Sequence, residues 1–120
     1  MEKFSIGQRL KSFDYAAKGI GNVLRREHNV WIHLTIALLV VAAGFFFDIQ
    51  RGEWIALVLC IGLVLAAETF NTAIERLVDL VSPNRHPLAG EVKDIAAGAV
   101  LICAIAAAVV GLIVFTPYLF

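Results

Sequence analysis

Four strongly polar side chains lie at the end of a long apolar run and share one face of a predicted helix. At about 3.6 residues per turn, one narrow stripe of that helix carries Glu68, Asn71, Glu75 and Asp79. Moving a carboxylate into a membrane costs roughly 2.5–3.5 kcal/mol on insertion scales. The stripe therefore predicts a functional site where a cation or another polar group meets these side chains.

Two carboxylates from different helices could hold one Mg²⁺ ion near the membrane surface. This ion usually takes one or two protein carboxylates and completes its shell with substrate phosphates and water. Glu27 and Glu75 are the candidates, although Glu27 could also simply pair with a neighbouring arginine. Lys93 and Asp94, at the start of the last apolar segment, could meet phosphate or could serve as helix-end anchors. Together these groups suit phosphoryl transfer.

Common nucleotide and zinc motifs are absent from the sequence, including GxxxxGK[ST], GxGxxG, HRD, DFG and HExxH. The histidines His28, His33 and His86 are scattered. Each is expected as a polar helix-end or loop residue rather than a metal ligand. The residues by themselves therefore do not establish an ATP site.

The composition predicts an all-α integral membrane protein with a single domain, 1–120. Hydrophobic residues make up 60% of the 120 residues, compared with roughly 45–50% in soluble domains. The predicted spans are 30–47, 54–77 and 95–115, each close to the roughly 20 residues that cross a bilayer. A short turn at 48–53 and a longer polar connection at 79–94 are expected between them.

An amphipathic surface helix is predicted over residues 1–28. Its apolar stripe, with alternating steps of four and three, consists of Ile6, Leu10, Phe13, Ala17, Ile20 and Leu24. Lys11 and Lys18 lie off this stripe. An anchor that binds anionic lipid is the simple interpretation, and a lid over an active site is the alternative.

Basic residues predict the orientation in the membrane. The basic N-terminal segment and the connection with Arg76, Arg85 and Lys93 must share a side if there are three spans. The positive-inside rule makes that side cytoplasmic, with the C-terminus outside and the polar stripe open to the cytosol. Because so small a domain cannot shield several polar groups from lipid, we expect an oligomer.

Two motifs resemble the prokaryotic diacylglycerol kinase family. They are Glu68-x-x-Asn71-Thr72-Ala73-Ile74-Glu75-x-x-Val78-Asp79 and Lys93-Asp94-Ile95-Ala96-Ala97-Gly98-Ala99-Val100, and the similarity extends over nearly the whole chain, including Tyr15-Ala16-Ala17-Lys18-Gly19. The resemblance implies a multi-pass protein of the bacterial cytoplasmic membrane that transfers the ATP γ-phosphate to a lipid hydroxyl. It also implies a homotrimer with active sites between subunits. No nucleic-acid partner is expected.

The resemblance assigns roles within this site. Glu68 would be the general base, oriented by Asn71, while Glu27 and Glu75 would hold the Mg²⁺ bound to ATP. Positioning and electrostatics supply most of such catalysis. The other residues implied to bind the nucleotide are Arg9, Tyr15, Asp79, Asn84, Arg85, His86, Lys93 and Asp94, of which Lys93 and Asp94 would also act in catalysis. Ungapped alignment brings Gln8 to the family's arginine position, and a shift of one residue favours Arg9.

The lipid substrate and one different function remain as alternatives. The segment 27–33 is more similar to the Gram-positive branch, which phosphorylates undecaprenol, than to the proteobacterial diacylglycerol branch, so undecaprenol is favoured. A small oligomeric proton- or cation-coupled transporter could instead use Glu68 as its intramembrane site. The crowding of carboxylates at the predicted cytoplasmic end argues against a pathway through the membrane. Turnover of ATP would separate the two functions.

Overall fold

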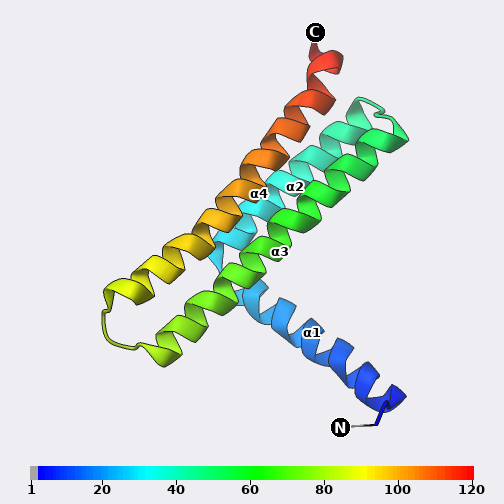
Figure 1. Ribbon diagram of the computed structural model, residues 1–120. Coiled ribbons are helices and arrows are strands. Elements are labelled where there is room, and N and C mark those ends of the chain that lie inside the picture. The colour runs from blue at the N-terminus through cyan, green and yellow to red at the C-terminus, as the bar shows by residue number, and fades with distance from the viewer. Residues whose placement is uncertain (1–2) are drawn as a thin grey trace.

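The computed structural model describes residues 3–120 and arranges them as four helices. These helices are α1 (Ile6–Arg26), α2 (His28–Phe46), α3 (Arg51–Val81) and α4 (Pro87–Leu119). In Figure 1, α2, α3 and α4 run side by side, while α1 projects away from the beginning of α2. The α3–α4 loop lies at one end of the three helices, and the α2–α3 turn and the C-terminus lie at the other.

Three of the helices are long and apolar enough to cross a membrane. They are α2 with 19 residues, α3 with 31 and α4 with 33. This confirms the prediction of an all-α protein with three candidate membrane spans. The helix α1 has 21 residues and occupies most of the predicted surface segment. Its position on the membrane surface and the exact limits of the spans, 30–47, 54–77 and 95–115, stay predictions.

The connection between α3 and α4 is shorter than the predicted polar connection 79–94, which was wrong in extent. Only residues 82–86 separate the two helices. Pro87 occupies the start of α4, where a missing N–H costs no helical hydrogen bond, and the His86 Nδ1 atom accepts a hydrogen bond from the Leu88 N–H at 3.1 Å. Both helices therefore continue beyond their apolar segments and carry polar residues in helical conformation.

The turn between α2 and α3 is also shorter than the predicted range 48–53, because α3 already begins at Arg51. Gln50 caps that helix, and its N–H donates to the Glu53 Oε1 atom at 2.9 Å. Asp48 has a φ of 50°, in the left-handed region that aspartate tolerates better than most residues. This conformation reverses the chain within a few residues.

The best-packed apolar core lies at the end with the α2–α3 turn. Its buried residues are Ile49, Leu57 and Val114, surrounded by Val40, Phe47, Trp54, Val110, Phe115 and Tyr118. The Tyr118 hydroxyl donates a hydrogen bond to the Glu53 carboxylate and thereby joins α4 to the beginning of α3. This core holds α2, α3 and α4 together away from the polar stripe.

Candidate functional site

Glu68 is a buried carboxylate on a helix apolar enough to cross a membrane. Only 4% of the residue is exposed. The His33 Nε2 atom, from α2, lies 2.9 Å from Glu68 Oε1. A buried carboxylate needs a polar or cationic partner, since its burial without one is strongly unfavourable. The imidazole of the neighbouring helix supplies that partner.

Asn71 lies about one turn beyond Glu68 and is also buried, with 8% of the residue exposed. Its Nδ2 atom donates a hydrogen bond to Glu75 Oε1 at 3.2 Å. Among residues 3–120, the buried Asn71 Oδ1 atom has no hydrogen-bond partner. A buried acceptor without a donor costs about 1–3 kcal/mol, so this oxygen is a local energetic cost within the polar stripe. The predicted role of Asn71 in orienting Glu68 stays a prediction, since its amide contacts Glu75.

Glu27 occupies the break between α1 and α2, where its extended backbone changes the direction of the chain. Its Oε1 atom lies 3.3 Å from Arg76 Nη2. The Arg76 Nη1 atom also donates to Asn22 Oδ1 at 2.6 Å. The cation beside Glu27 therefore comes from α3 rather than from a neighbouring arginine. Since Arg76 follows Glu75 directly in the sequence, this contact places Glu27 beside the part of α3 that carries Glu75.

The facing ends of α3 and α4 form a polar pocket of about 790 Å³. Lys93 Nζ lies 2.5 Å from Asp79 Oδ1 across this end of the helix pair. Six of the predicted site residues line the pocket: Asp79, Asn84, Arg85, His86, Lys93 and Asp94. The structure thus brings together cations, carboxylates, an imidazole and an amide from two helices and their loop.

The family of this chain follows from its similarity to known proteins. The family model described as prokaryotic diacylglycerol kinase matches residues 14–115. The chain belongs to the prokaryotic diacylglycerol kinase family. It is accordingly a membrane lipid kinase, and the matched range contains all the predicted site residues except Arg9.

Individual relatives from three bacteria carry the names of lipid kinases. The chain is 41% identical to the undecaprenol kinase of Bacillus subtilis over 91% of this chain and 89% of that protein. It is 40% identical to a diacylglycerol kinase of Synechocystis over 85% of this chain and 59% of that protein. It is 30% identical to the diacylglycerol kinase of Escherichia coli K12 over 83% of this chain and 82% of that protein.

Arg9 and Tyr15 do not line the polar pocket at the facing ends of α3 and α4. Both are exposed and line a separate groove near the start of α1. Figure 1 shows α1 leading away from the α3–α4 loop. The single chain therefore does not bring these two side chains to the polar pocket.

The metal prediction for this kinase depends on two carboxylates from different segments. Within residues 3–120, no group of three or more His, Cys, Asp or Glu side chains could hold a metal ion. Glu27 and Glu75 are both partly buried, and the contacts with Arg76 and Asn71 engage only one oxygen of each. Two carboxylates completed by phosphate and water match what Mg²⁺ takes in nucleotide sites.

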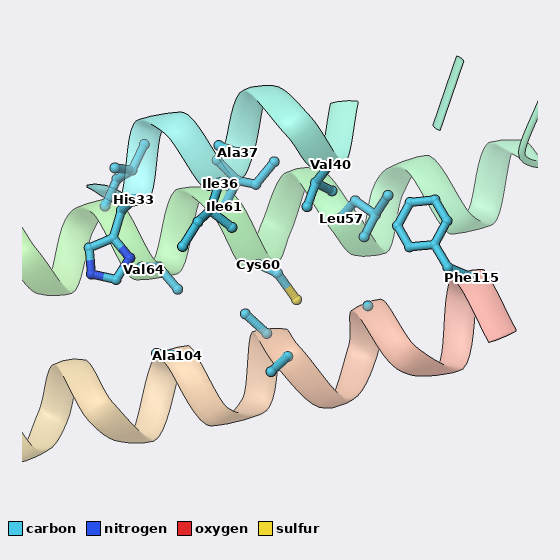
Figure 2. Close-up of a pocket in the computed structure, with 14 residues that line it drawn as sticks. His33, Ile36, Ala37, Val40, Leu57, Cys60, Ile61, Val64, Ala104 and Phe115 are labelled. Carbon is cyan, nitrogen blue, oxygen red and sulfur yellow. The ribbon is translucent and has the colours of Figure 1, made fainter. Parts of the chain in front are cut away.

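An apolar groove of about 280 Å³ runs between α2, α3 and α4 (Figure 2). The His33 imidazole lies at one end of this groove and the Phe115 ring at the other. The sequence pattern predicted His33 only as a helix-end or loop residue. A signal was present, because His33 falls inside the predicted span 30–47, and a polar residue in an apolar span was the observation that drew attention to Glu68.

Proposed function

We propose that this kinase transfers the γ-phosphate of ATP to the hydroxyl of a membrane lipid alcohol, with Mg²⁺ as its cofactor and the whole chain, 1–120, as one kinase domain. The observation that supports it most strongly is the burial of Glu68, 4% exposed, on an apolar helix. A lipid hydroxyl stays near the membrane interface, so the base that deprotonates it must lie there too. On the same helix, Glu75 and Asp79 continue towards the polar pocket.

The polar pocket is suited to the triphosphate. Lys93 carries a positive charge on α4, and Asp79 holds its ammonium group at 2.5 Å. Arg85 and the N-terminal end of α4 add positive charge or N–H donors to the same pocket. Asn84, His86 and Asp94 would complete the contacts with the nucleotide. This arrangement lets the phosphates approach from water while the acceptor approaches from the membrane.

The reaction needs one proton transfer and one exchange of bonds at phosphorus. Glu68 accepts the proton of the lipid O–H as that oxygen attacks the γ-phosphorus. The new O–P bond forms, the bond to the β–γ bridging oxygen breaks, and ADP leaves with that electron pair. Lys93 neutralises charge on the phosphates during this transfer. Glu68 then releases its proton to water.

Glu27 and Glu75 are the residues that would hold Mg²⁺. The bound ion would neutralise phosphate charge and orient the γ-phosphate. Asn71 holds Glu75 through a 3.2 Å hydrogen bond, and Arg76 lies 3.3 Å from Glu27. These contacts position both carboxylates before the nucleotide arrives.

We infer a homotrimer with active sites between subunits, in which α1 lies on the cytoplasmic surface and the C-terminus lies outside. Two observations favour shared sites. Arg9 and Tyr15 line a groove near the start of α1 that has no lining residue in common with the polar pocket, and in Figure 1 the helix α1 leads away from the α3–α4 loop. The basic residues of α1 and of the α3–α4 end favour a cytoplasmic position for both.

Undecaprenol is our favoured acceptor. The similarity to the Bacillus subtilis undecaprenol kinase, 41% identity over 91% of this chain, supports this choice. The 40% identity with the Synechocystis diacylglycerol kinase makes diacylglycerol the second candidate. The products would be undecaprenyl phosphate or phosphatidic acid.

The test is phosphate transfer from ATP by the purified protein in mixed micelles. Undecaprenol and diacylglycerol are offered in parallel, with and without Mg²⁺, and the phosphorylated lipid is quantified. We expect Mg²⁺-dependent formation of phosphorylated lipid with each of the two lipids, and none in the control without lipid. Transfer to undecaprenol should be faster than transfer to diacylglycerol. Faster transfer to diacylglycerol would overturn the substrate preference, and no transfer to either lipid would overturn the kinase proposal and favour the transporter.

A further inference from the structure

We propose that His33 is a positioning residue for the general base Glu68. This inference rests on the proposed function, because it gives His33 a role in the same transfer. It depends on a contact between two helices: His33 belongs to α2 and Glu68 to α3, and His33 Nε2 lies 2.9 Å from Glu68 Oε1.

The contact is shielded from bulk water. The His33 side chain is 22% exposed and the Glu68 side chain 6% exposed. Water therefore competes weakly for the carboxylate, and a contact made in such surroundings is stronger than one on the surface. The imidazole has a rigid ring and reaches Glu68 from the opposite helix, so it restricts the rotation of a flexible carboxylate.

The contact also gives the two carboxylate oxygens of Glu68 different roles. His33 engages Oε1 of Glu68. The other oxygen, Oε2, remains for the lipid hydroxyl. Asn71, the residue expected to orient the base, donates its amide hydrogen to Glu75 instead. His33 therefore supplies a contact that orients Glu68, a role that the family resemblance implied for Asn71.

His33 also lies between Glu68 and an apolar groove. It lines the groove between α2, α3 and α4, whose other walls include Ile36, Val64 and Ala104 (Figure 2). A single side chain thus contacts the buried carboxylate and borders an apolar surface of the three helices. Loss of the imidazole would leave Glu68 without its partner on the side facing α2.

The experiment compares His33→Leu with His33→Gln in the full-length protein. Leucine removes the donor, whereas glutamine keeps an N–H donor of similar reach. His28→Gln is the matched control, since His28 is an exposed histidine at the start of the same helix. Turnover is measured with saturating lipid and expressed per site that binds a non-hydrolysable ATP analogue in the presence of Mg²⁺. Misfolded protein lowers the number of such sites but not the turnover of each.

We expect His33→Leu to lower kcat per site by about 10–100-fold, the usual effect of losing a residue that orients an active-site group. The KM for ATP should stay unchanged, because the residues proposed to bind the triphosphate lie at the α3–α4 end. His33→Gln should recover most of the turnover, and His28→Gln should match the wild type.

A double-mutant cycle tests whether the effect acts through Glu68. Glu68→Asp shortens the side chain by one methylene and withdraws the carboxylate from His33. If His33 acts by positioning Glu68, His33→Leu should cost much less in the Glu68→Asp background than in the wild type. A residue that only supports helix packing would give independent, multiplicative losses.

Three outcomes would overturn the inference while leaving the kinase intact. They are wild-type turnover per site in His33→Leu, equal losses in His33→Leu and His33→Gln, or multiplicative losses in the cycle. Failure of the proposed function is distinguishable from all of these, because the wild-type protein would then phosphorylate neither lipid.

Discussion

Arg76 contacts Glu27 and thereby joins α3, one residue after Glu75, to the break between α1 and α2. The Arg76 Nη2 atom lies 3.3 Å from Glu27 Oε1, and the side chains are 42% and 30% exposed. A second contact, from Arg76 Nη1 to Asn22 Oδ1 at 2.6 Å, fixes the guanidinium against α1. A cation therefore occupies one oxygen of a carboxylate that we propose as a metal ligand.

Removing this cation should make Mg²⁺ bind more easily. Arg76→Gln keeps a donor for Asn22 but removes a positive charge that competes with the ion for Glu27. An exposed ion pair is worth roughly 0–1 kcal/mol, which corresponds to at most about a fivefold change in affinity. We expect the Mg²⁺ concentration that gives half-maximal turnover to fall by about twofold to fivefold.

Titration of turnover with Mg²⁺ measures this effect. Arg51→Gln is the matched control, because it removes the same charge at the opposite end of α3. An unchanged or higher Mg²⁺ requirement in Arg76→Gln would contradict the competition between arginine and metal at Glu27.

Glu75→Gln should weaken binding of the metal–nucleotide complex as well as turnover. The substitution keeps the size of the side chain and the acceptor for Asn71, but it removes the charge that Mg²⁺ needs. We expect the half-maximal Mg²⁺ concentration to rise by at least about tenfold. Equilibrium binding of an ATP analogue at several Mg²⁺ concentrations checks this, with Asp14→Asn on α1 as the control. Wild-type Mg²⁺ dependence would remove Glu75 from the metal site.

Glu68→Gln should abolish turnover and spare nucleotide binding. Glutamine fits the same volume and can still meet His33, but it cannot accept the proton of the lipid hydroxyl. Loss of a general base costs about 10²–10⁴-fold. Turnover with each lipid and binding of the ATP analogue are measured on the same preparation. Wild-type turnover in this variant would refute the assignment of the base, whereas loss of nucleotide binding would place Glu68 among the nucleotide ligands.

Most of the fold could be predicted from sequence because it depends on the continuity of apolar residues. Three apolar segments correspond to three long helices. The helix ends could not be predicted in the same way, because polar residues next to a span look alike in a loop and in an aqueous helical turn. Pro87 illustrates this, since it indicated a loop but begins α4. Proline is tolerated there because the first helical N–H has no partner.

Site residues that share one helix could be predicted from the sequence. Contacts between side chains of two different helices could not. Periodicity places Glu68, Asn71 and Glu75 on one face of α3, and the burial of Glu68 and Asn71 agrees with it. The contacts of His33 with Glu68 and of Arg76 with Glu27 depend on how α2 and the α1–α2 break are rotated against α3. That rotation is set by packing, which the pattern of a single helix does not contain.

Lys93→Met should impair the use of ATP more than Lys93→Arg. Methionine keeps the length and apolar stem of the side chain but removes the charge that we propose to meet phosphate. A hydrogen bond to a charged group contributes about 1.5–3 kcal/mol, which corresponds to about a 10–100-fold loss in kcat/KM for ATP. Arginine should retain part of the activity because it keeps both the charge and a partner for Asp79. Steady-state kinetics with varied ATP measure this, and equal activity of the methionine variant and the wild type would contradict the role.

Gly44 accommodates the ring of Trp54 where α2 meets α3. A Cβ atom at position 44 would lie 2.6 Å from Trp54 Cη2 and 2.8 Å from Cζ2, closer than atoms can approach. The ring cannot withdraw freely, because it also packs against Phe45 with the ring centroids 4.8 Å apart. Glycine at this position therefore permits the close approach of the two helices.

Gly44→Ala should consequently destabilise the protein without changing the chemistry. Overpacking costs about 1–3 kcal/mol, and we expect a lower midpoint of thermal unfolding in detergent with normal turnover per nucleotide-binding site. Gly52→Ala is the control, since no atom lies within 4 Å of an added Cβ there. A combined Gly44→Ala and Trp54→Leu variant removes the clashing ring atoms and should lose less stability than the two single changes together. If Gly44→Ala unfolds at the wild-type temperature, the contact between Gly44 and Trp54 does not limit the packing of α2 against α3.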